Sequence, residues 1–178
     1  LYKRLTSDLG YSHEDVKDII YSIPTSSIAY EFTRRFYEIL DINVENIAAG
    51  FNAYDLINVK NDKDEVDYER ISSLLRQKRG FSKITLRDEI KAGEKIVKFG
   101  AVIGNPPYQK GISEEKLNSS LSKQLFPYYT ILSMEITTNI SSLIIPARWF
   151  AGDAQDKSFL KLREFFKTKD TLSDLYYF

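Results

Sequence analysis

Four consecutive residues, Asn105, Pro106, Pro107 and Tyr108, carry the groups needed to bind a planar molecule with an exocyclic amine. Each proline fixes its own φ near −65° and lacks an N–H, and each forces the residue before it into an extended conformation. The Asn105 side-chain oxygen and the Pro106 carbonyl oxygen are therefore stiffly held acceptors, with the flat ring of Tyr108 beside them. Two such acceptors can bind the two hydrogens of an aromatic amine while its ring stacks on the tyrosine.

A site of this kind favours chemistry at the amine nitrogen. The lone pair of an adenine amine is delocalised into the ring, which makes the nitrogen a weak nucleophile. Acceptors placed for a pyramidal nitrogen stabilise the attacking geometry more than the ground state. No general base with a shifted pKa is needed to start the reaction. The alternative interpretation is that the four residues only form a stiff turn after a strand.

The elements around the tetrapeptide support the functional interpretation. Hydrophobic spacing and turn residues predict helices and short apolar strands in alternation. Helices are expected from Ser12, from 25 or 26 to 40, over 68–78, over 125–138 and along a face with Phe159, Leu162 and Phe166. Strands are expected at 19–23, 46–52, 99–103, 142–145 and 172–178, with a β-leaning segment at 83–86. Turns or loops are expected at 61–67, 91–94 and 109–123. The alternation predicts an α/β domain with a mostly parallel sheet, in which ligands bind at the carboxyl ends of strands.

Aromatic residues are abundant, and we expect most of them in the core. Ile28, Phe32, Phe36 and Ile39–Leu40 recur at helical spacing. The aromatic residues of this segment are expected in the helical core: Tyr30, Phe32, Phe36 and Tyr37. Trp149 and Phe150 follow a strand-ending proline and could line a pocket for a planar ligand, but packing is the favoured interpretation.

Composition excludes several classes of function. The chain has 178 residues, enough for one domain with its own core, and its 25 basic and 25 acidic residues give a net charge of zero, so no polybasic arm dominates. The absence of cysteine excludes disulfides, thiol catalysis, iron–sulfur clusters and thiolate zinc, and the single His13 leaves no metal site to expect. No stretch approaches the ~20 apolar residues of a membrane span, and no signal peptide is visible. We therefore expect a cytoplasmic protein without membrane contact. The start at Leu1 and the apolar end at 175–178 predict a piece of a longer polypeptide.

The tetrapeptide resembles motif IV of the class I S-adenosylmethionine-dependent amino-methyltransferases, in which Asn, Asp or Ser precedes Pro-Pro and an aromatic residue. The resemblance is closest to the adenine-N6 DNA methyltransferase part of type IIG restriction–modification enzymes. It covers most of the chain, although only motif IV is specific. The matching segments are residues 20–24 and 28–31 (second strand and following helix), 99–109 (motif IV strand and loop), and 143–150 with 162–166 (next strand, loop and helix).

The resemblance implies a fold, a reaction and a partner. The fold would be a Rossmann-like class I methyltransferase sheet, mostly parallel and truncated at its N-terminal edge. Within the motif Asn105-Pro106-Pro107-Tyr108, Asn105 and Pro106 would hold the target amine and Tyr108 would stack on an adenine flipped out of double-stranded DNA. The methyl group would come from S-adenosylmethionine by direct displacement. Neither the DNA sequence recognised nor the oligomeric state follows from the sequence.

The cofactor-binding residues depart from the family pattern. The glycine-rich first motif is absent, since the eight glycines contain no Gly-x-Gly. Pro24 stands where the family has the acid that holds the cofactor ribose, and Asp55 or Asp88 could lie near the cofactor adenine. Pro24, Asp55 and Asn105 are thus the positions expected nearest the cofactor. Residues 1–178 would form a partial catalytic domain that lacks the first cofactor motif and the target-recognition domain, and would be inactive and not bind the cofactor alone.

Two alternatives remain open at this point. Protein glutamine-N5 and RNA guanine-N2 methyltransferases use the same tetrapeptide, because their substrates also offer a planar amine. The chain could also be a non-catalytic methyltransferase-like scaffold that contacts DNA or protein, which Pro24 and the missing first motif favour.

Overall fold

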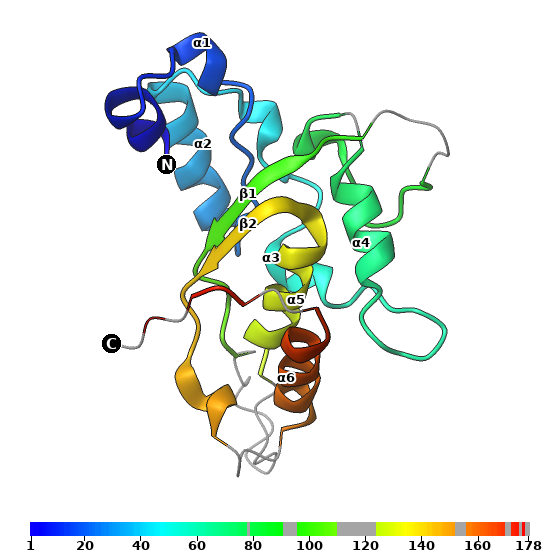
Figure 1. Ribbon diagram of the computed structural model, residues 1–178. Helices are drawn as coiled ribbons and strands as arrows, with labels where there is room; N and C mark the ends of the chain where they lie inside the picture. Colours follow the sequence, from blue (N-terminus) through cyan, green and yellow to red (C-terminus); the bar gives the residue numbers. More distant parts are fainter. Residues whose placement is uncertain are drawn as a thin grey trace. The chain divides into compact units, whose positions relative to one another are not determined.

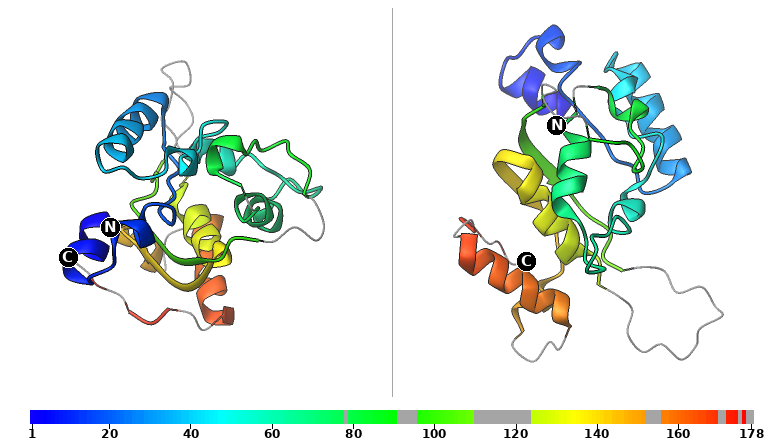
Figure 2. Two further views of the ribbon diagram at one scale, coloured as in Figure 1. Left: turned by 90° about the horizontal axis from the view of Figure 1, so that it is seen from above. Right: turned by 90° about the vertical axis from the view of Figure 1, so that its right-hand side faces the viewer.

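The computed structural model describes residues 1–77, 79–90, 96–109, 124–151, 156–169, 172–174 and 176. It divides into two compact units, Leu1–Val97 (unit 1) and Lys98–Phe178 (unit 2). The two units are described separately, and both can be followed by colour in Figures 1 and 2.

Unit 1 is built from short helices. They are η1 (a π-helix, Arg4–Asp8), α1 (His13–Val16), α2 (Ser27–Ile39), η2 (3-10, Val44–Asn46), α3 (Ala53–Leu56), α4 (Tyr68–Leu75) and η3 (3-10, Phe81–Lys83). The α-helices begin at polar residues, because the side chains of Ser12, Ser26, Asn52 and Asp67 accept from backbone N–H groups of the first turn. The helix starts predicted at Ser12 and at residue 26 are confirmed, although α1 ends at Val16.

The strands expected in unit 1 are reduced to one bridge. Ser22 and Ile47 form an isolated parallel bridge, in which the Ser22 N–H donates to the Asn46 carbonyl and the Ala48 N–H donates to the Ser22 carbonyl, each at 3.0 Å. The predictions of full strands at 19–23 and 46–52 are therefore wrong, and so is the β-leaning segment at 83–86, where η3 ends. The parallel direction of the bridge between Ser22 and Ile47 agrees with the predicted parallel sheet.

One buried cluster of unit 1 includes Ile47 of that bridge. Val16, Ile20, Tyr37, Ile42 and Ile47 form a buried cluster, and four half-buried residues pack against it: Tyr2, Leu5, Tyr30 and Leu40. The Tyr37 hydroxyl lies 2.6 Å from the Ser22 hydroxyl, so its polar end is satisfied inside the cluster. Burial raises the pKa of the Tyr37 phenol. This cluster occupies the face of α2 that carries Tyr30 and Tyr37.

The other face of α2 corrects a prediction. Ile28, Phe32, Phe36 and Ile39 are 82%, 69%, 53% and 79% exposed. They share one side of the helix, and the Phe32 and Phe36 ring centroids are 5.7 Å apart. Helical spacing correctly predicts that these residues lie on one face, but this face is not the one that packs on the core. We call these four residues the α2 outer row.

Unit 2 contains the strands. It consists of β1 (Phe99–Gly104), α5 (Phe126–Ile136), β2 (Thr137–Leu143), η4 (3-10, Ala147–Phe150) and α6 (Lys157–Lys169). β1 and β2 lie side by side and parallel, with Val102 opposite Ser141 and Gly104 opposite Leu143 (Figure 1). The helix expected at 125–138 and the strand expected at 142–145 are both present. α5 ends at Ile136 and runs directly into β2, so the strand begins earlier than predicted. The strand predicted at 172–178 is not seen at residues 172–174 and 176. The rest of that segment lies outside the described residues, and so do the turn predicted at 91–94 and residues 110–123 of the predicted loop.

The core of unit 2 lies between its two helices. α5 buries residues on most of its circumference, including Phe126, Tyr129 and Leu132, as expected for a helix covered on several sides. The Phe126 ring lies 5.6 Å from that of Phe159 on α6. Trp149 is buried, with ring centroids 4.2 Å from Phe150 and 5.3 Å from Phe166, so the packing interpretation of this tryptophan is confirmed.

The mixed α/β class and the parallel pairing are confirmed, and the described residues form a two-stranded sheet. None of the helices described is both long and apolar enough to cross a membrane.

Candidate active site

The tetrapeptide lies directly after the last paired residue of β1. Gly104 is the final residue of the strand, and its carbonyl accepts from the Ile144 N–H at 3.0 Å. Asn105 therefore leaves the sheet at the carboxyl end of a parallel strand, the position where ligands bind in sheets of this kind. Asn105 is exposed, and the two prolines that follow are half-buried.

The Asn105 and Tyr108 side chains are bonded to each other. The Tyr108 hydroxyl donates to Asn105 Oδ1 at 2.5 Å, and lies 3.5 Å from the Ile144 carbonyl oxygen. The first distance is that of a short hydrogen bond and the second is at the outer limit of one. The structure thus brings together the acceptor and the aromatic ring that the sequence singled out.

Tyr108 is held in place through its backbone and its ring. Its carbonyl accepts from the Leu125 N–H at 2.8 Å, and the next residue, Gln109, forms an antiparallel bridge with Gln124. Its ring meets that of buried Phe126 edge-on, with centroids 6.5 Å apart and an interplanar angle of 85°. Tyr108 as a whole remains 36% exposed, which leaves part of the residue open to a ligand. Among the described residues, no backbone N–H donates to the Pro106 carbonyl.

Pro24 has a structural contact in unit 1. It is buried, and its carbonyl accepts from the Ala53 N–H at the start of α3, at 2.9 Å. Its side chain has no polar atom, and its backbone acceptor already has a partner. Pro24 therefore does not fit a contact with the cofactor ribose.

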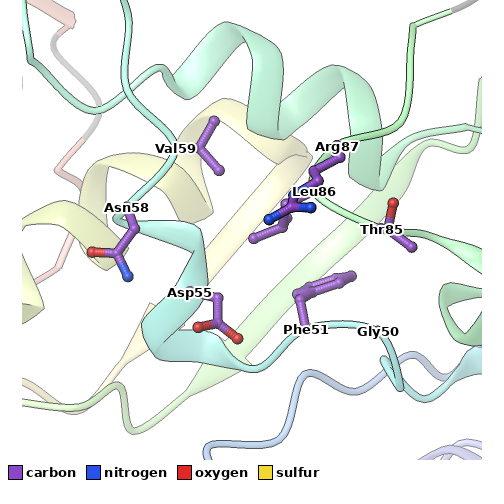
Figure 3. A pocket seen from close by; sticks show the side chains of 8 residues that line it. All are labelled: Gly50, Phe51, Asp55, Asn58, Val59, Thr85, Leu86 and Arg87. Atoms are coloured by element: carbon purple, nitrogen blue, oxygen red, sulfur yellow. The ribbon is translucent and has the colours of Figure 1, made fainter.

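Asp55 lines an open pocket of about 600 Å³ within unit 1 (Figure 3). Its Oδ2 accepts from the Asn52 N–H at 2.9 Å as part of the α3 capping box. The remaining lining residues combine an aromatic ring, aliphatic groups and polar side chains: Gly50, Phe51, Asn58, Val59, Thr85, Leu86 and Arg87. The volume lies within the range of small-molecule sites, and the chemistry of these side chains fits a flat, hydrogen-bonding heterocycle.

Asp88 holds a turn and does not line that pocket. Its two oxygens accept from the Thr85 N–H at 2.8 Å and the Thr85 hydroxyl at 2.9 Å, and it is paired with Arg79. The backbone N–H of Thr85, followed by its hydroxyl and the Arg79 charge, holds the pKa of this carboxyl below its ordinary value of 3.8. Of the two aspartates considered for the cofactor adenine, Asp55 is the one beside an open space.

Most of the pocket could not be found in the sequence. Phe51, Asn58 and Arg87 belong to no motif, and the turn at 85–87 is brought to α3 only by folding. Among the described residues, no group of three or more His, Asp or Glu is arranged to hold a metal ion.

Comparison with known proteins identifies the family. The family model of the Eco57I restriction-modification methylase matches residues 18–178. This chain belongs to that family. The family resemblance carried by the tetrapeptide and its flanking segments is therefore confirmed for a restriction–modification methylase.

A curated protein of Mycoplasma pneumoniae, described as an uncharacterized adenine-specific methylase, is 24% identical over 110 residues. The match covers 59% of this chain and 25% of the relative, so the chain spans about a quarter of the length of the relative it matches. No solved structure matches the chain.

Proposed function

We propose that this member of the Eco57I methylase family provides the target-amine site of an adenine-N6 DNA methyltransferase in a type II restriction–modification system. The observation that carries the proposal is the exposed Asn105 acceptor beside the Tyr108 ring, at the carboxyl end of β1. Family membership and the adenine-specific relative support it. The substrate would be double-stranded DNA.

The tetrapeptide would act by binding and orienting one base. An adenine extruded from the duplex stacks on the exposed part of the Tyr108 ring, since a base inside the stack cannot reach these groups. Asn105 Oδ1 and the Pro106 carbonyl accept the two amine hydrogens and favour a pyramidal nitrogen, whose lone pair is then no longer delocalised into the ring. Pro107 keeps Pro106 extended, so that the Pro106 carbonyl does not need to reorganise during the reaction.

S-adenosylmethionine would supply the methyl group as a sulfonium. Asp55 and the side chains around it are the residues in unit 1 that fit its heterocycle, whereas Pro24 does not fit its ribose. We therefore propose Asp55, with Phe51 and Asn58, for the cofactor adenine, and we assign Pro24 no direct contact.

The test is transfer of labelled methyl groups to duplex DNA by the intact protein. Asn105→Ala removes one of two acceptors that act on the transition state, and we expect a loss of about 100-fold or more in turnover. Asn139→Ala is the matched control, because Asn139 is an exposed asparagine on β2 of the same unit. Turnover of Asn105→Ala within about threefold of the control would contradict the proposal.

The same assay separates the alternatives. Labelling of a release-factor-like peptide or of RNA, with none in DNA, would assign the tetrapeptide to a glutamine or guanine methyltransferase. Binding of duplex DNA without any transfer would indicate the non-catalytic scaffold, the candidate that the buried, already bonded Pro24 favours.

A further inference from the structure

We propose that the bond between the Tyr108 hydroxyl and Asn105 Oδ1 is a latch, which occupies Asn105 until a stacked aromatic ring offers an amine in its place. This inference rests on the proposed function and extends it. It concerns the hydroxyl group of Tyr108, which stacking alone does not require.

The latch occupies the acceptor that the reaction needs. At 2.5 Å, the bond from the Tyr108 hydroxyl to Asn105 Oδ1 is shorter than the usual 2.7–2.8 Å between hydroxyl donors and their acceptors. The hydroxyl has one proton to donate. The Ile144 carbonyl oxygen lies 3.5 Å away, so at that distance it competes poorly with Asn105 Oδ1 for this proton. In this structure, Asn105 Oδ1 is therefore already bonded within the tetrapeptide.

A stacked base and the latch make incompatible demands on Asn105. Conjugation keeps a phenolic O–H near the plane of its ring, so an acceptor bonded to it lies close to that plane. A base stacked on the ring lies in a parallel plane about 3.5–4 Å away, the separation at which carbon atoms attract best. Its amine needs an acceptor about 2.9 Å from the nitrogen. Asn105 must therefore leave the phenol plane before it can bind the amine.

The surroundings indicate which of the two side chains moves. Tyr108 is held by the Leu125 N–H on its carbonyl and by the buried Phe126 ring against its edge. Asn105 is exposed and follows the last residue of β1. The Asn105 side chain is thus the part that swings, and Tyr108 is the fixed part of the latch.

The hydroxyl would also favour amines over other stacked rings. A ring without an amine can stack on Tyr108 but offers no donor to replace the Tyr108 hydroxyl at Asn105 Oδ1. An amine offers such a donor, so Asn105 Oδ1 exchanges one hydrogen bond for another. In Tyr108→Phe the hydroxyl is missing, so the Asn105 side chain should be able to turn toward a stacked amine without first breaking a hydrogen bond.

The experiment compares wild type, Tyr108→Phe and the matched control Tyr11→Phe in the intact protein. Tyr11 is an exposed tyrosine of unit 1, far in sequence from the site. Side-chain amide NMR signals of Asn105, assigned by their loss in Asn105→Asp, report the latch without any ligand. Titration with adenosine and with purine riboside, which lacks the amine, reports its effect on binding.

We expect the Asn105 amide signals to shift in Tyr108→Phe and to stay unchanged in Tyr11→Phe. Tyr108→Phe should bind adenosine about two- to tenfold more tightly than wild type, the range that one net hydrogen bond supports, and purine riboside with unchanged affinity. Unchanged Asn105 signals, or equal or weaker adenosine binding by Tyr108→Phe, would overturn the latch and leave the proposed function standing. Absence of adenosine binding to every variant would overturn both.

Discussion

Gly80 and Gly50 lie where the backbone of another segment passes too close for a side chain. A Cβ on Gly80 would lie 2.6 Å from the Glu45 carbonyl oxygen, and one on Gly50 would lie 2.7 Å from the Ile84 carbonyl oxygen. Neither contact involves the flexible end of a side chain, so the backbone itself would have to shift. These glycines permit the close approach of segments in unit 1.

Gly80→Ala should destabilise unit 1 by about 1–3 kcal/mol, the usual effect of overpacking. Gly100→Ala is the control, because a Cβ at Gly100 meets nothing within 4 Å. The free energy of unfolding, from urea denaturation followed by circular dichroism, checks both variants. Equal stability of the two variants would show that the Glu45 backbone yields without cost.

Asp88 gives unit 1 a dependence on pH. Its folded pKa is lowered by the Thr85 N–H and hydroxyl and by Arg79, so its ionised form stabilises the folded state. This contribution is complete above the ordinary value of 3.8 and is lost as the pH falls below it through the lowered pKa. Asp88→Asn should therefore be less stable than wild type at about pH 7, with a difference that shrinks below pH 3.8. Urea midpoints measured across this range check the prediction, and a difference that grows on acidification would contradict it.

Residue types alone located the tetrapeptide, because two prolines after an apolar strand have local conformational effects that no distant contact can change. They did not distinguish Asp55 from Asp88. The first lines a pocket that forms only when residues 50–59 and 85–87, distant in sequence, fold together. The second closes a local turn with Thr85, three residues before it.

At the scale of elements, the α2 outer row should make the chain self-associate. Ile28, Phe32, Phe36 and Ile39 form an exposed apolar strip, and contiguous strips of this kind promote aggregation. The double variant Phe32→Ser with Phe36→Ser should reduce light scattering at high concentration and leave the free energy of unfolding nearly unchanged.

Ile47→Ala is the contrasting variant. Ile47 is fully buried in the cluster that α2 packs on, and its truncation should cost about 2–5 kcal/mol. A comparable loss of stability in the Phe32 and Phe36 double variant would show that the outer row is buried in solution.

Helices were predicted better than strands for a physical reason. A helix start depends on neighbouring residues, as the caps at Ser12, Ser26 and Asp67 show. A strand depends on a distant partner, and residues 19–23 find theirs at Ile47 only. Spacing likewise places residues on a common face of α2, but which face packs on the core is decided by the rest of the unit.

At the scale of the whole chain, residues 1–178 should not bind S-adenosylmethionine with micromolar affinity. The sequence has no Gly-x-Gly segment, and Pro24 offers no free acceptor to a ribose. Calorimetric titration checks this, with Asp55→Ala beside the wild type. Micromolar binding that Asp55→Ala abolishes would show that the pocket in unit 1 holds the cofactor without a glycine-rich motif.

The burial of Trp149 has a practical consequence. It is the single tryptophan among 12 tyrosines, and it lies in unit 2 against Phe150 and Phe166. Indole absorbs at longer wavelengths than phenol, so excitation at the red edge of the aromatic band selects this one ring. The intrinsic emission of the protein is therefore a built-in optical reporter for the unit that carries the tetrapeptide, and it requires no dye and no engineered label.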